Sequence, residues 1–209
     1  MREAKVRFVP VLIAALLAGA APARANHPDE RLDEVMAEKE PAFEATGLWR
    51  LPDTRLAAAD GSPLDLDDPE DRIVILSFLP EGCGAPCADQ QAALREVQKS
   101  LNVTPMRDMV LFITVGAKAP SDPGWDSANW QGAVAGAGPV ADATGAFAAL
   151  SDRADGAPMV HIVDRGGRHA GIFHGAGFAK INMVLYINGL TNAHPAKRGW
   201  LDRILGAFE

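Results

Sequence analysis

The sequence contains few cysteines and almost no tyrosine. Its 209 residues include two cysteines, Cys83 and Cys87, and a single tyrosine. A disulfide between cysteines four positions apart closes so small a loop that it restricts the unfolded chain very little. A domain of this size buries about 70% of its unfolded surface and folds without a disulfide. We therefore interpret Cys83 and Cys87 as a functional pair that is either redox-active or metal-binding. A purely structural disulfide is the simplest alternative.

The sequence also lacks a basic cluster. It carries 27 acidic residues against 20 lysines and arginines, which gives a net charge of −7. A chain this acidic repels nucleic acids and anionic lipid head groups. We therefore expect no nucleic-acid partner.

The first 25 residues have the features of a secretory signal peptide. A basic head is followed by the apolar run Phe8 to Ala20 and by the small-x-small sequence Ala23-Arg24-Ala25. The run is shorter than the roughly 20 residues that span a membrane. Removing this segment, which holds four cations and one anion, takes the net charge from −7 to −10. We expect cleavage after Ala25 and a periplasmic protein, with an uncleaved membrane anchor as the alternative.

The two cysteines lie between a predicted strand and a predicted helix. The apolar run Ile73–Leu79 predicts a buried strand, and a helix is predicted from about Ala85 to Leu101. Residues four apart on a helix share a face, so we expect both sulfurs to project from the first helical turn. A helix N-terminus favours thiolate over thiol. A reactive dithiol and a soft-metal site both need this arrangement.

The rest of the pattern predicts one α/β domain over residues 47–209, preceded by an acidic tether or helix over residues 26–46. Asp60-Gly61 predicts an N-terminal hairpin. The other predicted elements are a strand at Met109–Val115, a loop at Ala117–Gly138, a helix at Val140–Leu150, strands at Val160–Val163 and Arg168–His174, and helices at Phe178–Leu190 and Gly199–Phe208. Strand, helix and strand in succession imply a parallel pair.

This order of parts, with Cys83-x-x-x-Cys87 and the segment Gly156-Ala157-Pro158-Met159, resembles a thioredoxin-like fold. Over roughly Leu51 to Leu190 the chain resembles the SCO/SenC family of copper-binding, cytochrome-oxidase assembly proteins. The resemblance implies a three-layer α/β/α fold with a central mixed sheet. It also implies that Ala157, Pro158 and Met159 form a cis-proline loop facing the cysteines, and that Cys83 and Cys87 bind copper for a respiratory enzyme.

The family's third copper ligand is a histidine just ahead of the strand that begins here at Val160, where this chain has Gly156. If Asp164 to Gly167 form a tight turn, His174 lies opposite Ala157 or Pro158, at the edge of the cysteine pocket. Two thiolates and one imidazole suit copper. We therefore expect His174 to complete the metal site. Met159 and His161 are alternative ligands.

Three functions are compatible with these residues. The spacing and the export signal favour a copper-binding assembly factor. The second function is a thiol–disulfide oxidoreductase, in which Cys83 attacks the disulfide of another periplasmic thiol protein and Cys87 resolves the mixed disulfide. The third is a partner-binding scaffold that has kept the fold without metal or redox chemistry.

Overall fold

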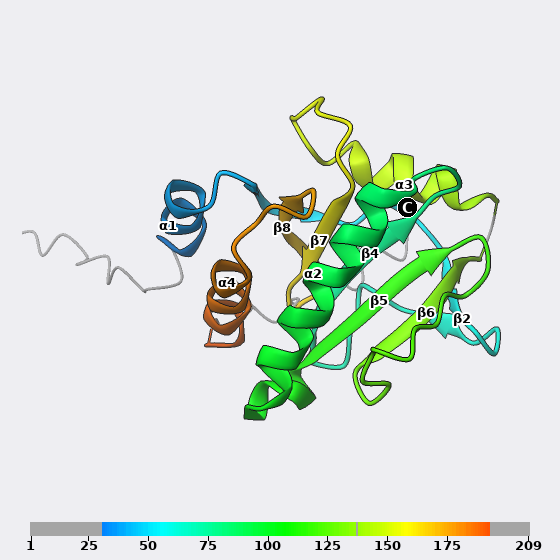
Figure 1. Cartoon of the computed structure of the whole chain (residues 1–209), viewed down its shortest axis with the longest axis horizontal. Coiled ribbons are helices and arrows are strands. Elements are labelled where there is room, and N and C mark those ends of the chain that lie inside the picture. Colours follow the sequence, from blue (N-terminus) through cyan, green and yellow to red (C-terminus); the bar gives the residue numbers. More distant parts are fainter. Residues whose placement is uncertain (1–30, 137, 193–209) are drawn as a thin grey trace, which may run out of the picture.

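The structure is a computed structural model that describes residues 31–136 and 138–192. The expected signal peptide and the helix expected at Gly199–Phe208 lie outside these ranges. Within them, no helix is both long and apolar enough to cross a membrane. In chain order the elements are α1 (Leu32–Lys39), β1 (Phe43–Arg50), β2 (Leu56–Ala58), β3 (Pro63–Leu64), β4 (Ile73–Leu79), α2 (Ala85–Asn102), the 3-10 helix η2 (Pro105–Met109), β5 (Val110–Gly116), β6 (Trp130–Ala135), α3 (Val140–Ala148), β7 (Met159–Val163), β8 (Arg168–His174) and α4 (Lys180–Asn192) (Figure 1).

The strands form one mixed sheet in the order β1-β8-β7-β4-β5-β6-β2-β3. β4, β5 and β6 are parallel, and the remaining pairs are antiparallel. β4 and β5 are apolar over almost their whole length because both of their faces are covered. The α/β class and the mixed sheet expected from the sequence are confirmed.

Helices cover both faces of the sheet (Figure 1). On one face, α2 and α4 pack with Leu94 and Tyr186 in one apolar cluster. On the other face, α3 contributes Phe147 to a second cluster that includes Leu76 and Phe78 of β4. The expected three-layer, thioredoxin-like arrangement is therefore present. The cysteine segment follows β4 and leads from the sheet into α2.

The Asp60-Gly61 hairpin is also present. It joins β2 to β3, and Gly61 has a φ of +83°, a conformation that glycine adopts without strain. β2 pairs in turn with β6, so the hairpin extends the edge of the sheet beyond the parallel strands.

The segment expected as a loop at Ala117–Gly138 contains a strand. β6 runs parallel to β5 and carries Gly132 at a point where any Cβ would collide with the backbone of Pro120. Glycine and alanine are weak strand formers, so this strand has little local signal. Trp125 and Trp130 in this segment stack on each other, with ring centroids 4.6 Å apart.

The acidic segment expected as a tether or helix at residues 26–46 contains both α1 and the start of β1. Met36 and Phe43 are buried in the same cluster as α2 and α4. The expected boundary between residues 46 and 47 falls inside β1, which pairs with β8 at the edge of the sheet. In the sequence, the many charged residues of this segment mask the signal of the few apolar residues that pack against the core.

The β7–β8 hairpin turns through Asp164, whose carboxylate accepts hydrogen bonds from the backbone of Gly166 and Arg168. An irregularity between Ile162 and Val163 shifts the register, so His174 pairs with Met159. A regular hairpin would have placed His174 opposite Ala157 or Pro158. The sequence of the turn does not reveal this irregularity, so the pairing partner of His174 could not be predicted from it.

Candidate functional site

The two cysteines lie at the junction of β4 and α2 and form a disulfide, with their Cα atoms 5.7 Å apart. Only Cys87 belongs to the helix, whose N-cap is Gly84. Gly84 has a φ of +58°, so the chain turns back before the helix begins. The expectation that both sulfurs project from one helical turn is therefore wrong, because Cys83 reaches Cys87 from the preceding turn.

The two sulfur-bearing residues differ in their exposure. Cys87 is 3% exposed, whereas Cys83 is half-buried. The Sγ atom of Cys87 lies 3.7 Å from the carbonyl oxygen of Phe78 at the end of β4. A partner molecule can therefore approach Cys83 and not Cys87.

A pocket of about 440 Å³ opens beside the disulfide. Its lining is largely apolar and includes both cysteines, Phe78 and Ala148. The segment Gly156–Met159 closes one side, and His161 of β7 lies at the wall. The pocket is suited to an apolar group of a molecule that approaches the disulfide.

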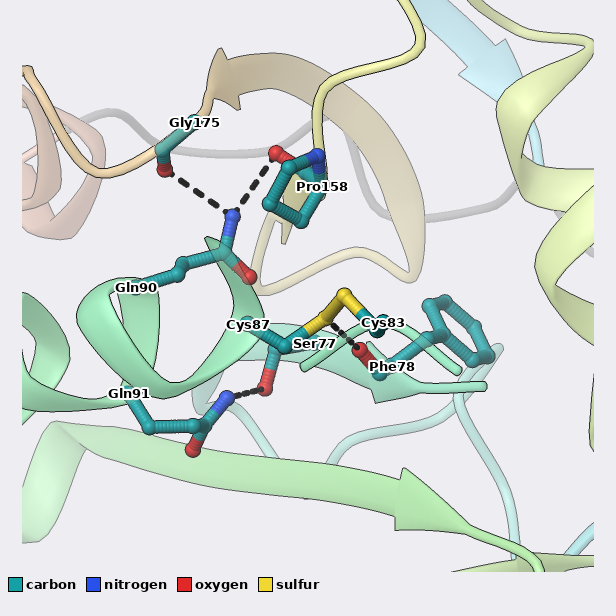
Figure 2. Close-up of a disulfide and its surroundings, with 8 residues drawn as sticks. All are labelled: Ser77, Phe78, Cys83, Cys87, Gln90, Gln91, Pro158 and Gly175. Atoms are coloured by element: carbon teal, nitrogen blue, oxygen red, sulfur yellow. Dashed lines mark hydrogen bonds between the residues drawn. A yellow bond between two sulfur atoms is a disulfide. The ribbon is translucent and has the colours of Figure 1, made fainter. Parts of the chain in front are cut away.

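Pro158, which the family resemblance places opposite the cysteines, lines the same pocket as they do, but its preceding peptide bond is trans. The cis geometry expected for this loop is wrong. The loop is held from α2 by Gln90, whose Nε2 donates to the carbonyl oxygens of Pro158, at 2.8 Å, and of Gly175, at 3.0 Å (Figure 2). One hydrogen bond thus joins the Pro158 loop to the cysteine helix, and the other joins the end of β8 to it.

The next residue of α2 makes a second polar contact beneath the disulfide. Gln91 donates from Nε2 to Ser77 Oγ at 3.0 Å (Figure 2). Its Oε1 accepts from the hydroxyl of Thr114 on β5. Trp130 of β6 donates to the same threonine hydroxyl. These buried groups are mutually satisfied, so they attach the first turns of α2 to the central strands.

His174 is not among the residues that line the pocket. Its Nε2 lies 2.7 Å from Glu44 Oε2 on β1, and its Nδ1 lies 3.2 Å from Asp155 Oδ2. Burial would raise the pKa of Glu44, but hydrogen bonds from Ser151, the backbone of Asp152 and His174 outweigh it and lower that pKa. The structure thus places His174 in a polar cluster next to the Pro158 loop, and its role as a copper ligand stays a prediction.

His161 does line the pocket, and it is linked to the interior by hydrogen bonds. Its Nδ1 lies 3.0 Å from Nε2 of His169 on β8. The Nδ1 of His169 lies 2.8 Å from Thr46 Oγ1 on β1. Burial lowers the pKa of His169 to about 4. Burial also lowers the pKa of His161 well below its usual value, and the neighbouring His169 lowers it further. Both rings are therefore neutral at pH 7.

Copper binding depends on the reduced form of the pair. Among residues 31–136 and 138–192, no three His, Cys, Asp or Glu side chains are grouped so that they could hold a metal ion. The disulfide sulfurs are not thiolates, so they would have to be reduced first. Reduction supplies two soft donors in a pocket that the Met159 thioether and the His161 imidazole also line. The donor set therefore fits copper by its chemistry.

Sequence analysis identified both cysteines, Pro158 and the neighbouring strand. It missed Gln90, Thr46, His169 and Glu44, each of which contacts a strand or loop more than 60 positions away in the chain. No local signal marks such residues. Their roles depend on which strands pair.

No protein-family model matches the sequence, and no curated protein is similar to it in sequence. Solved structures do share its fold. The SCO1/SenC family lipoprotein of Bacillus anthracis has a TM-score of 0.52 at 15% identity, covering 70% of this chain and 97% of that one. Yeast Sco1 with copper bound has a TM-score of 0.54 at 13% identity, covering 73% and 99%.

BsSco, a Sco-family cytochrome c oxidase assembly protein in which a disulfide switch was identified, has a TM-score of 0.52 at 12% identity, covering 71% of this chain and 96% of that one. At these identities the comparisons establish the fold. The resemblance to SCO/SenC proteins expected from the sequence is confirmed at that level: this chain has the thioredoxin-like fold of the SCO1/SenC structures.

Proposed function

We propose that the protein exchanges thiols and disulfides with a partner through Cys83 and Cys87. The observation that carries this proposal is the unequal exposure of the two bonded cysteines beside an apolar pocket. Exchange needs one accessible sulfur for the partner and one protected sulfur for resolution. A purely structural bridge has no need of either the pocket or the asymmetry.

The reaction follows from this arrangement. In the reduced protein, the Cys83 thiolate attacks a partner disulfide, forms a mixed disulfide and releases one partner thiolate. Cys87 then attacks Cys83 Sγ, restores the Cys83–Cys87 disulfide and releases the second partner thiol. The partner disulfide gains two electrons and the cysteine pair loses two. The N-terminus of α2 stabilises thiolate character at Cys87 during this step.

Reduction of a protein disulfide tests this function. The wild-type protein should accelerate the reduction of insulin by dithiothreitol, and Cys83→Ser should abolish the acceleration. Cys87→Ser should accumulate a mixed disulfide instead of turning over. Asp89→Ala, an exposed change on the same helix, is the matched control. Wild-type activity no greater than that of Cys83→Ser would refute the proposal.

Copper binding by the reduced pair is a second candidate. The composition of the pocket favours it, because a thioether and a neutral imidazole line the wall beside the two sulfurs. Yeast Sco1, whose fold is similar, was crystallised with copper bound. The reduced protein should bind one Cu(I), and Cys83→Ser or Cys87→Ser should abolish binding. His174→Ala tests the sequence-based ligand: it should weaken Cu(II) binding if His174 contributes, and equal Cu(II) affinities would exclude it.

The expected localisation and partners are part of the same proposal. The N-terminal sequence supports export to the periplasm, where disulfide chemistry is common. The partner would be a copper-receiving respiratory enzyme or another periplasmic thiol protein. N-terminal sequencing of exported protein should find Asn26 first. A retained Met1 in the membrane fraction would indicate an anchor.

A further inference from the structure

The N-terminal helix α1 is attached to α4 at both of its ends (Figure 1). At the C-terminal end, the Glu40 carboxylate accepts a hydrogen bond from the backbone N–H of Ala179, just before α4 begins, at 2.8 Å. Along the helix, Leu32 packs so closely on Gly189 of α4 that a Cβ there would lie 2.7 Å from it. Because α1 precedes β1 and lies outside the sheet, it can leave α4 without breaking any strand pairing.

The attachment at the other end is a hydroxyl group between two oxygen atoms. Tyr186 of α4 is 0% exposed, and its Oη lies 2.8 Å from Asp33 Oδ1 and 3.0 Å from the carbonyl oxygen of Ala170. Ala170 lies at the irregularity of β8, where the register of both neighbouring strands skips one residue. The phenol therefore joins the first turn of α1 to this point of the sheet.

A count of protons decides the state of Asp33. The phenol has one proton, and the carbonyl oxygen of Ala170 can only accept. If Asp33 is ionised, Tyr186 can satisfy one of the two acceptors, and the other contact then holds two oxygens with no proton between them. If Asp33 is protonated, it donates to Tyr186 Oη, and the phenol proton remains for Ala170. Burial favours the same state because it raises the pKa of Asp33, although the hydrogen bond with Tyr186 lowers it.

The surrounding charges do not supply a counterion for an ionised Asp33. The charged groups on the elements packed around the pair are Arg31 and Glu34 of α1, which pair with each other, Glu40 of the following turn, and Asp164 at the β7–β8 turn, which pairs with Arg168. Both arginines thus have other carboxylate partners. Asp164 raises the pKa of Tyr186, as does Asp33, so the phenol stays protonated.

We propose that Asp33 carries a proton when α1 is docked and donates it to Tyr186, and that loss of this proton to solvent as the pH rises releases α1 from α4. The residues Asp33 and Tyr186 form the latch, and Glu40 holds the opposite end of the helix. Neither latch residue lines the disulfide pocket, so the latch does not depend on the chemistry of the cysteines.

The direction of the pH dependence follows from the two states of the helix. In the released helix, Asp33 faces water and has a pKa of about 3.9. Between that value and the raised pKa of the docked state, the released form has lost a proton that the docked form keeps. Docking therefore weakens about tenfold for each pH unit in this interval, is strongest below it and changes no further above it. This sign is opposite to that expected for the buried histidines, so a local measurement is needed.

Oxidation of Met36 by hydrogen peroxide measures release of α1 directly. Met36 of α1 is 3% exposed, and its thioether has no titratable group, so its oxidation requires the helix to open. The oxidised protein is treated at a series of pH values, digested and analysed by mass. In the wild type, the rate should rise with pH by up to about tenfold per pH unit over the interval.

Asp33→Asn keeps the shape of the protonated acid and an N–H donor for Tyr186 but cannot ionise, so its Met36 oxidation should stay slow at every pH. Glu34→Gln, an exposed change in the same turn, is the matched control and should keep the wild-type pH dependence. A wild-type rate that does not change with pH, or an equal rise in Asp33→Asn, would overturn the proposal. An equal rise at Met183, which is 0% exposed, would show opening of the whole domain and would also overturn it.

The proton itself can be measured without any opening. Carbon-13 spectra of the Asp33 carboxyl group should give a titration midpoint above the value of about 3.9 for an exposed aspartate. A midpoint at or below that value would overturn the proposal, whatever the rate of Met36 oxidation.

Discussion

Lowering the pH from 7 to 5 should destabilise the fold through its buried imidazoles. Burial lowers the pKa of His169 to about 4, although the Glu44 carboxylate acts in the opposite direction. A histidine in the unfolded chain titrates near 6.5. Between these values the unfolded state binds a proton that the folded state does not, so stability falls as the pH falls.

The size of this effect follows from the two pKa values. His169 alone should cost about 2 kcal/mol between pH 7 and pH 5, and the loss should level off at about 3 kcal/mol below pH 4. His161, whose pKa is lowered further by burial and by His169, adds a loss of the same sign. Glu44 does not contribute in this range, because its lowered pKa affects stability only at lower pH.

Urea unfolding of the oxidised protein at the two pH values measures the loss. The wild-type protein should lose at least about 2 kcal/mol, and His169→Gln should lose about 2 kcal/mol less than wild type over the same interval. Equal stability of the wild type at pH 7 and pH 5 would refute the argument. An unchanged loss in His169→Gln would show that other groups cause it.

Three further predictions concern contacts around the site. Gln90→Leu removes the hydrogen bonds to Pro158 and Gly175, at about 1 kcal/mol each, and should lower the melting temperature by roughly 4–8 °C, whereas Asp89→Ala should not; equal melting temperatures would show that these bonds do not stabilise the fold. Gly132→Ala should cost about 2–3 kcal/mol in urea unfolding because its Cβ meets the Pro120 backbone, whereas Gly145→Ala in α3, where a Cβ meets nothing within 4 Å, should gain about 0.5–1 kcal/mol; similar effects of the two would contradict the packing of β6. Glu44 has a lowered folded pKa, so its contribution to stability is present above its unfolded pKa and is lost as the pH falls through the folded one; Glu44→Gln should flatten that acid-side decline in a pH series, and an unchanged decline would contradict it.

The helices and strands with the strongest sequence signals were predicted correctly. β4, α2 and β8 were predicted within two residues at each end because long apolar runs and clear turns delimit them. β6 was missed because Gly132 and its alanine neighbours have little strand preference, and their strand exists through pairing with β5.

The candidate site was predictable only in part, for reasons that lie in long-range pairing. The cysteines and Pro158 were identified because their order along the chain is distinctive. The position of His174 depended on an irregularity between Ile162 and Val163 that no turn count reveals. The partner Thr46 lies 123 positions from His169, so its role appears only when β1 is paired with β8.

The most direct test of the central claim is to trap the mixed disulfide. Reduced Cys83→Ser and Cys87→Ser proteins are each mixed with a peptide disulfide at equal concentration, quenched with acid and analysed by mass. The account predicts that Cys87→Ser, which keeps the half-buried Cys83, is converted rapidly to the mixed disulfide, and that Cys83→Ser, which keeps the 3% exposed Cys87, reacts much more slowly. Equal rates in the two variants, or faster reaction at Cys87, would contradict the division of roles between the two sulfurs.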